Sequence, residues 1–457
     1  MLTRIEIDGF KTFERFHLDL GPFLVILGPN ACGKSNLFDA MRLLSTLTTL
    51  DLRSAVQQMR GEPYELFRRA GDGRAGQKMA FAVEVLLEPR VRDPWGAEVE
   101  LRSTRLRYEL TIELRQERGV ERLFVTHEAV RPILKKDDHL DRLPGYEVSP
   151  RFLKTFAKYH RRSPFLETDV SGPRPILEIH NDGVQGRNSH RPADAAEATV
   201  LSSITSAEYR HLYALREEMR SWCFLQLNPT VMRRASSTVA PEYLEADGNN
   251  LATVLARIRA LTTTDDRPKG VIADIAADLA SLIPSVKALE IKEDIPNREF
   301  YLEILQKDGI RFSSRVVSDG TLRVLALLTM LHDPRRRGLI CLEEPENGVH
   351  PIRLKMLIAR LEELSTDPAS DQDATGEPLA QMLLNSHSPV VLSSLPLGRV
   401  VFADMVTAID PVTKQSSRRT RLRFVEDTLP LEPDDPNKVS SYEVHQILET
   451  VDQGASA

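Results

Sequence analysis

The chain has 457 residues, with 60 Lys and Arg against 66 Asp and Glu, and a formal net charge of -6. This balance excludes a whole-chain attraction to nucleic acid, so contact with DNA would need a local basic patch. No apolar run approaches the roughly 18 residues of a membrane span, and charges throughout the first twenty residues exclude a secretory h-region. We therefore expect a cytoplasmic protein with no membrane partner and, at this length, two lobes or a large insertion.

The first motif is a phosphate-binding loop. Residues 23–27 (FLVIL) form an apolar run typical of a buried strand, and helical spacing begins at Lys34. Between them, GPNACGKS fits the pattern G-x-x-x-x-G-K-[ST] without a mismatch. In such a loop, backbone N–H groups and the helix N-terminus face the phosphates, Lys34 adds a positive charge and the Ser35 hydroxyl ligates Mg²⁺. The residues expected at the nucleotide are Gly28, Pro29, Asn30, Ala31, Cys32, Gly33, Lys34, Ser35 and Asn36.

The middle of the chain changes from strand-like to helical patterns. Three alternating segments, at 79–89, 105–114 and 121–130, predict antiparallel strands. The stretch 150–164 carries Arg and Lys with interleaved aromatics; it could contact a phosphate backbone, but a solvated helix face over core aromatics is the favoured interpretation. Amphipathic helical segments at 209–229, 249–264 and 271–286 then predict a lid or arm of helices. Sustained a/d heptads are absent, which excludes long coiled-coil arms.

The C-terminal third supplies acids and a polar turn. Ser318, Asp319, Gly320 and Thr321 precede an apolar helix, with Ser318 available as its N-cap. An apolar strand follows at 339–342 and ends in two carboxylates, Glu343 and Glu344, and a third strand at 382–384 leads to His387.

One edge of a sheet would then hold five polar side chains, because open α/β sheets bind ligands at the carboxyl ends of their strands. These are Lys34, Ser35, Glu343, Glu344 and His387. They supply what phosphoryl transfer needs: a cation, an acid for Mg²⁺, a base for water and a γ-phosphate sensor.

In this order the motifs resemble an ABC-type ATPase of the SMC/RecF kind and, within it, the AAA_21-like group related to the ATPase half of OLD-family nucleases. Residues 28–35 resemble Walker A, 318–320 that group's variant of the signature, 339–344 Walker B, 346–348 the D-loop, and His387 in SHSP the switch histidine. The first twenty residues resemble the opening hairpin of the family. The resemblance implies an α/β fold: an ABC-type P-loop ATPase head, with a mixed sheet, flanking helices and an antiparallel β subdomain, and a mostly helical insertion.

The resemblance also implies roles for residues. Glu344 would be the general base and Glu343 would hold Mg²⁺ through water, while Lys34 and His387 would act on the phosphates. The signature residues Ser318, Asp319 and Gly320 would face ATP bound by a second subunit, so ATP would hold together a homodimer or a higher oligomer through composite sites. Two positions depart from the common pattern: Glu343 replaces the usual Asp, and Asp319 replaces Gly. The Q-loop glutamine stays open among Gln57, Gln58 and Gln77.

The expected organisation is an ATPase head in two parts, 1–130 with Walker A and the antiparallel β subdomain and 286–457 with the other motifs, around an insertion at 131–285. After His387 we expect a hairpin from 399–410 to 418–425, and the polar stretch 365–378 reads as a loop. The residues after His387 are too few for the nuclease domain of OLD proteins.

These features predict an ATPase whose ATP-driven dimer is a sensor or switch for a separately encoded effector, such as a nuclease, in prokaryotic antiphage defence. Two alternatives stay open: a DNA-repair ATPase that acts on DNA directly, and a nearly non-hydrolysing, ATP-gated assembly scaffold. Glu344 argues against the scaffold, because a general base serves hydrolysis.

Overall fold

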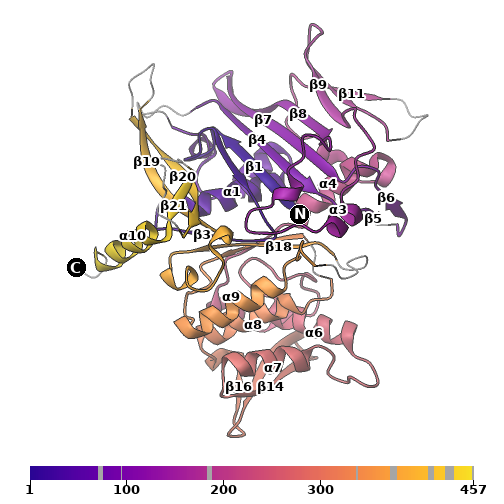
Figure 1. The fold of residues 1–457 in the computed structure, drawn as a ribbon. Helices are drawn as coiled ribbons and strands as arrows, with labels where there is room; N and C mark the ends of the chain where they lie inside the picture. The colour runs from indigo at the N-terminus through magenta and orange to yellow at the C-terminus, as the bar shows by residue number, and fades with distance from the viewer. Residues whose placement is uncertain are drawn as a thin grey trace. The chain divides into compact units, whose positions relative to one another are not determined.

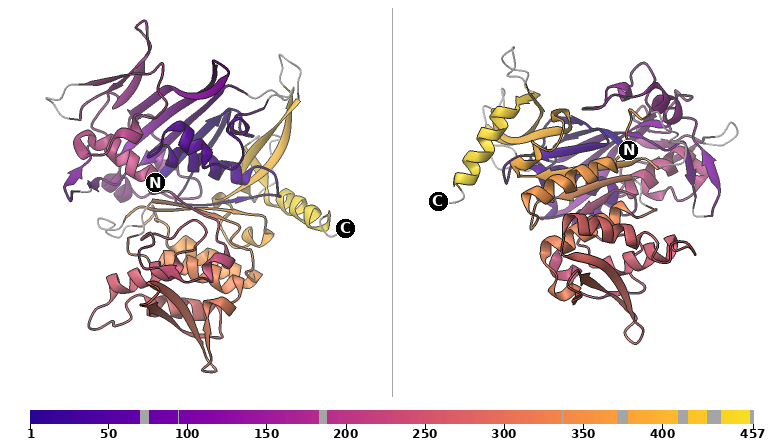
Figure 2. Two further views of the ribbon diagram at one scale, coloured as in Figure 1. Left: turned by 180° about the vertical axis from the view of Figure 1, so that it is seen from behind. Right: turned by 60° about the horizontal axis from the view of Figure 1, so that its bottom comes forward.

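The structure is a computed structural model, which describes residues 1–69, 76–93, 95–182, 188–335, 338–370, 378–409, 416–427 and 437–454. The chain forms two compact units, which we describe one at a time. Unit 1 contains residues 1–222, 366–381 and 396–457, and unit 2 contains residues 223–365 and 382–395. Each unit is thus built from segments that lie far apart in the sequence, as the colours of Figures 1 and 2 show.

An antiparallel sheet of eight strands forms much of unit 1 (Figure 1). Its order is β11-β10-β9-β8-β7-β4-β1-β2, and all neighbours run antiparallel. The strands are β1 (Leu2–Asp8), β2 (Phe16–Asp19), β4 (Lys78–Leu86), β7 (Arg105–Glu117), β8 (Val120–Pro132), β9 (Leu166–Asp169), β10 (Ile176–Ile179) and β11 (Ser189–Pro192). The expected opening hairpin and the three expected strands are confirmed. Their alternation has a physical origin, since Ile5 and Ile7 of β1 are buried while Arg4 and Glu6 lie on the other face.

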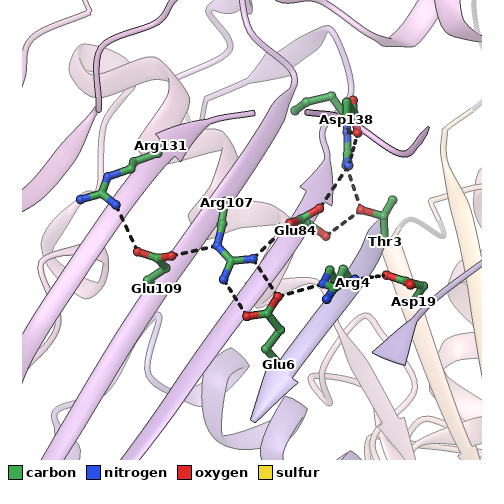
Figure 3. A network of polar contacts seen from close by, with 10 residues as sticks. Thr3, Arg4, Glu6, Asp19, Glu84, Arg107, Glu109, Arg131 and Asp138 are labelled. Carbon is green, nitrogen blue, oxygen red and sulfur yellow. Dashed lines mark hydrogen bonds and ion pairs between the residues drawn. The ribbon is translucent and has the colours of Figure 1, made fainter. Parts of the chain in front are cut away.

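That other face carries a network of ion pairs (Figure 3). Arg107 lies at its centre: Nη2 is 2.7 Å from Oε2 of Glu6 on β1, and Nε is 2.8 Å from Oε1 of Glu109 on β7. The hydrogen bond from Arg107 lowers the pKa of Glu6 to about 2. Arg4 bonds to Glu6 as well, at 2.8 Å. The face is therefore polar, with the charges of both signs paired within it.

A second group of strands in unit 1 includes β3 (Phe23–Leu27), the strand that leads into the phosphate loop. The others are β19 (Val400–Ile409), β20 (Ser416–Glu426) and β21 (Lys438–Ser440). β3 and β19 run parallel, β19 and β20 form an antiparallel hairpin, and β21 runs parallel to β20. All five side chains of β3 are buried, as an apolar run of this kind predicts. The hairpin expected after His387 is confirmed.

The remaining elements of unit 1 are shorter or helical. They are α1 (Lys34–Thr46), α2 (Leu52–Gln57), α3 (Pro150–Phe156), α4 (Arg210–Arg220), α10 (Ser441–Gly454) and the antiparallel pair β5 (Arg90–Arg92) and β6 (Glu98–Glu100). Its 3-10 helices span Pro63–Leu66, Leu140–Arg142, Leu201–Ser203, Ala207–Tyr209 and Leu397–Arg399.

Unit 2 combines two small groups of strands with helices, drawn from pink to orange in Figure 1. The strands β12 (Cys223–Leu225), β17 (Gly338–Glu343) and β18 (Ala380–Ser386, which enters the unit at Met382) are neighbours in that order. The other group has the order β13 (Ser236–Ser237), β15 (Glu299–Gln306) and β14 (Val286–Asp294), with β16 (Arg311–Ser313) also paired to β15. The helices are α5 (Pro229–Met232), α6 (Leu251–Thr262), α7 (Ile272–Leu282), α8 (Asp319–Leu331) and α9 (Pro351–Glu363), with 3-10 turns at Ser314–Val316 and Pro389–Val391.

The expected α/β class, with flanking helices and an antiparallel β part, is confirmed. Within residues 131–285, β9 to β11 extend the antiparallel sheet, and the longer helices begin only with α4. The division at residues 130 and 285 stays a prediction. In the described part of the chain no helix is longer than the 14 residues of α10, and none has the length and apolar character that crossing a membrane requires. Of the polar stretch 365–378, residues 371–377 lie outside the described residues.

Candidate nucleotide-binding site

The phosphate loop of unit 1 joins the buried strand β3 to helix α1. The strand ends at Leu27 and the helix begins at Lys34. Between them, Ala31 and Gly33 have φ angles of 62° and 98°, in the left-handed region that most residues avoid. These two positions let the chain turn sharply from the strand into the helix.

Lys34 folds back onto the beginning of this loop. The residue is 7% exposed, and its Nζ donates to the carbonyl oxygens of Gly28 and Pro29 at 2.6 and 2.8 Å. Helix α1 has no acidic residue in its first turn, and Gly33 gives it no side-chain cap. The positive end of the helix dipole is therefore not offset by an acid of that turn, and the ammonium group adds to it. Such an arrangement favours an anion like phosphate.

The other loop residues fill space or bond to neighbours. Asn30 is exposed, and Asn36 donates from Nδ2 to Oγ1 of Thr12 at 2.9 Å. Cys32 is buried, and burial raises the pKa of its thiol. Because a raised pKa keeps the thiol protonated, the structure favours a filler role for Cys32 over an oxidation-sensitive one.

Two threonines outside the motif also hold the loop, and the sequence did not point to them. Oγ1 of Thr420, on β20, lies 2.9 Å from the carbonyl oxygen of Cys32 and 2.7 Å from Oγ1 of Thr12. Thr420 is 388 residues away from Cys32 in the chain. Neither threonine belongs to a recognisable pattern, so only the three-dimensional arrangement reveals them.

In unit 2, the strand β17 leads directly to the predicted base. It ends at Glu343, and the next residue, Glu344, has a φ of 50°. The backbone N–H of Glu344 donates to the carbonyl oxygen and to Oδ1 of Asn385, at 3.1 and 2.9 Å. Its carboxylate accepts a hydrogen bond from Nδ2 of Asn347 at 2.6 Å. A carboxylate held in a left-handed backbone conformation by several bonds is typical of a functional position.

Next to this turn, Glu346 meets the predicted switch histidine. Oε1 of Glu346 accepts hydrogen bonds from the backbone N–H of His387 and from Oγ of Ser386, both at 2.8 Å, and it lies 3.0 Å from Nδ1 of His387. The histidine side chain is about one third exposed, whereas that of Glu346 is 9% exposed. β17 and β18 are neighbouring strands, so their ends place Glu344, Glu346 and His387 in one region, as the sequence suggested.

The signature turn of unit 2 packs against the D-loop. Ser318 is the N-cap of α8 and accepts a hydrogen bond from the backbone N–H of Thr321 at 3.3 Å, which confirms the expected cap. A Cβ on Gly320 would lie 2.0 Å from the carbonyl oxygen of Gly348. The two glycines therefore allow the backbones of the signature and the D-loop to touch.

An arginine that no motif contains holds the same turn. The guanidinium of Arg233, just after α5, donates to the carbonyl oxygen of Val317 at 2.9 Å and forms an ion pair with Asp319. These two partners lie on either side of Ser318 in the sequence. The carboxylate of Asp319, which departs from the common signature, is thus neutralised by a neighbouring cation.

The candidate residues are divided between the two compact units. Lys34 and Ser35 belong to unit 1, whereas Glu343, Glu344 and His387 belong to unit 2. A single site that holds all five therefore stays a prediction. The Ser35 hydroxyl and the Glu343 carboxylate are oxygen ligands of the kind that Mg²⁺ prefers, so these residues fit that ion.

The basic stretch at 150–164 forms only a short helix, α3. Phe152 and Phe156 are buried in a hydrophobic cluster, and Nζ of Lys158 donates to the backbone of Lys154 at 2.9 Å. The aromatic side chains therefore serve the core, as the favoured interpretation predicted.

Comparison with known proteins places the chain in a family. Residues 23–200 and 229–393 match the family described as "AAA domain, putative AbiEii toxin, Type IV TA system". Over 57 residues the chain is 46% identical to the chromosome partition protein Smc of Chlorobaculum tepidum. That stretch makes up 12% of this chain and spans 5% of the length of the Smc protein.

Three of the solved structures found to be similar are heads of Smc proteins. One is a head bound to the C-winged helix domain of ScpA (TM-score 0.47, 12% identity, 93% of this chain and 98% of that one). Another is a Pyrococcus furiosus head with an extended coiled coil, bound to the C-terminal domain of ScpA (TM-score 0.44, 12% identity, 99% of each chain). A third is the head domain from Thermotoga maritima (TM-score 0.36, 11% identity, 93% and 99%). The family match, which includes most of the chain, assigns it: the protein belongs to the family described as "AAA domain, putative AbiEii toxin, Type IV TA system".

Proposed function

We propose that this protein binds and hydrolyses ATP, and that ATP closes a dimer which acts as a switch for a separately encoded effector, such as a nuclease, in prokaryotic antiphage defence. The observation that carries the proposal is Glu344, a carboxylate that directly follows β17 in a left-handed backbone conformation. A position of this kind is costly to maintain and is usually retained for function.

Each group of the proposed site has one chemical task. In the proposed site Lys34 leaves the carbonyl oxygens of its loop to neutralise phosphate charge, and the N-terminus of α1 adds its dipole. Glu344 orients the attacking water and accepts its proton, with Asn347 fixing the carboxylate. His387 senses the γ-phosphate. Bound Mg²⁺, held by Ser35 and Glu343, would neutralise the charge that develops on the phosphate oxygens.

The dimer follows from the signature. Ser318 and the N–H of Gly320 stand at the exposed N-terminus of α8, where a phosphate of a second copy would be bound favourably. The same contact made twice by two copies gives a two-fold interface with two composite sites. Hydrolysis removes the phosphate that joins the subunits, so the dimer loosens after each turnover.

A protein partner is better supported than direct action on DNA. The net charge of the chain is -6. In the basic stretch around α3, the guanidinium of Arg161 already donates hydrogen bonds to the carbonyl oxygens of Pro164 and Asn181, at 2.8 and 3.1 Å. The family description names a putative toxin of a toxin–antitoxin system, which fits a protein that works with a second, separately encoded component.

The test compares phosphate release by the wild type and by Glu344→Gln, with Mg²⁺ and with or without linear duplex DNA. We expect hydrolysis by the wild type, a loss of at least about 100-fold in the variant, and a rate that DNA does not change. Light scattering should show that ATP converts Glu344→Gln into a stable dimer.

The matched control is Glu363→Gln, which alters an exposed carboxylate paired with Arg360 on α9. It should hydrolyse ATP like the wild type. If both the wild type and Glu344→Gln hydrolyse ATP at the same measurable rate, the base is another residue. Strong stimulation by DNA would favour the DNA-repair alternative, and a wild type that releases no phosphate above a protein-free blank would favour the scaffold.

A further inference from the structure

We infer that the C-terminal hairpin β19–β20 supports the phosphate loop of the nucleotide site and that Thr420, on this hairpin, positions the loop. The inference rests on the proposed function, since it assumes that this loop binds ATP. All of the residues involved lie in unit 1, so it does not depend on the dimer or on the effector.

The hairpin touches the phosphate loop at both of its motif glycines. A Cβ on Gly28 would lie 2.3 Å from the carbonyl oxygen of Ala403 on β19. A Cβ on Gly33 would lie 2.0 Å from Oγ1 of Thr420 on β20. Neither contact leaves room for a methyl group, because real Cβ atoms do not come within 3.0 Å of other heavy atoms. Both ends of the loop are therefore packed against the same hairpin.

The hydrogen bonds at Thr420 have a determined direction. The carbonyl oxygen of Cys32 can only accept, so Thr420 must donate its one hydroxyl proton there, at 2.9 Å. The hydroxyl of Thr12, 2.7 Å from Thr420, must then donate to Thr420, and Thr12 itself accepts from Nδ2 of Asn36 at 2.9 Å. The result is a chain, Asn36 to Thr12 to Thr420 to Cys32, in which each hydroxyl both donates and accepts. Such chains strengthen their members.

This chain fixes the orientation of one peptide group of the loop. In a trans peptide the C=O and the following N–H point in opposite directions. With the carbonyl of Cys32 held toward Thr420, the N–H of Gly33 is directed away from the hairpin. Thr420 is 4% exposed, and its own N–H donates to the carbonyl oxygen of Thr12 at 3.0 Å, so the residue is itself anchored. Thr420 thus acts as a positioning residue for a donor of the phosphate loop.

The test removes the hydroxyl but keeps the shape of the side chain. Thr420→Val deletes two hydrogen bonds and preserves the backbone bond to Thr12, whereas Thr420→Ser retains the hydroxyl. Calorimetry with ATP and Mg²⁺ should give about tenfold weaker binding for Thr420→Val, equivalent to about 1.4 kcal/mol, and wild-type binding for Thr420→Ser. The matched control is Thr407→Val, an exposed position of the same hairpin that pairs with Arg418. In hydrolysis assays Thr420→Val should raise KM more than it lowers kcat.

The outcomes separate this inference from the proposed function. If the wild type binds ATP and Thr420→Val binds it equally well, the inference is overturned. If the wild type binds no better than Lys34→Ala, the proposed function fails. Thermal unfolding without nucleotide checks the fold; should Thr420→Val be unfolded, Thr12→Val carries the test, because it breaks the chain one step from the loop. Binding by Thr12→Val within twofold of the wild type would then overturn the inference.

Discussion

The contact between Gly320 and Gly348 makes Gly320→Ala a sharp test of the signature turn. The new Cβ would lie 2.0 Å from the carbonyl oxygen of Gly348, about 1.4 Å short of the 3.4 Å at which ordinary contact begins. The obstacle is backbone, and Gly348 has a φ of 74°, a conformation that already needs glycine. Helix α8 cannot retreat easily, because Leu322 and Leu325 are fully buried. The signature and the D-loop must therefore separate by about 1 Å.

A displacement of this size in the groups around a reacting phosphate can cost about 100-fold in rate. We expect Gly320→Ala to lose hydrolysis by that order, measured as phosphate release at saturating ATP. The affinity of the monomer for ATP should stay unchanged, because the phosphate loop belongs to unit 1. The control is Gly172→Ala, where the nearest atom to a Cβ is the carbonyl oxygen of Arg174 at 3.7 Å. Hydrolysis by folded Gly320→Ala within about threefold of the wild type would refute this reasoning.

Two further predictions concern charge. Burial raises the pKa of Glu128 from its ordinary 4.5 to about 7, so the folded state favours the protonated carboxyl group. This preference contributes fully to the free energy of unfolding below pH 4.5. The contribution falls by about 3 kcal/mol as the pH rises from 4.5 through 7. Urea unfolding at pH 5 and pH 8 should show the wild type losing stability relative to Glu128→Gln, and a constant difference would contradict the assignment. For Arg233→Ala, whose ion pair with Asp319 is partly exposed, we expect the free energy of unfolding to change by less than about 1 kcal/mol. Because Arg233 also bonds to Val317, its loss should loosen the signature turn, and light scattering should show weaker ATP-dependent dimerisation. Unchanged dimerisation would show that the contacts of Arg233 with this turn do not matter for the dimer.

The parts of the fold that could be predicted are those with a local burial pattern. β3 and β17 are continuous apolar runs, and β1 and β7 alternate between a buried face and a polar one. The choice of strand partners could not be predicted in this way. β19 lies beside β3, from which it is separated by most of the chain, and β9 to β11 extend the antiparallel sheet although each is only four residues long. Pairing depends on contacts between remote segments, which periodicity does not contain.

The same division holds for the candidate site. Lys34, Glu344 and His387 stand in short motifs, whose spacing reflects the strand, turn and helix that present them. Thr420 and Arg233 have no such signal. Thr420 donates a hydrogen bond to the backbone of a motif residue, Cys32, and Arg233 donates one to Val317, the residue before the signature. A backbone carbonyl can accept from almost any polar side chain, so neither contact leaves a pattern in the sequence.

The motif glycines lie where residues of a motif meet residues from a remote part of the chain. Gly28 and Gly33 each lie where a remote segment approaches too closely for a side chain, and the neighbour is Ala403 in one case and Thr420 in the other. Gly320 meets Gly348 in the same manner. A glycine in a motif therefore indicates that another segment packs closely against it, but the sequence of the motif does not identify that segment. It follows that the geometry of the phosphate loop depends on the loop together with the hairpin residues that contact it. Substitutions of those residues, such as Thr420→Val, should therefore change nucleotide binding even though they leave GPNACGKS intact.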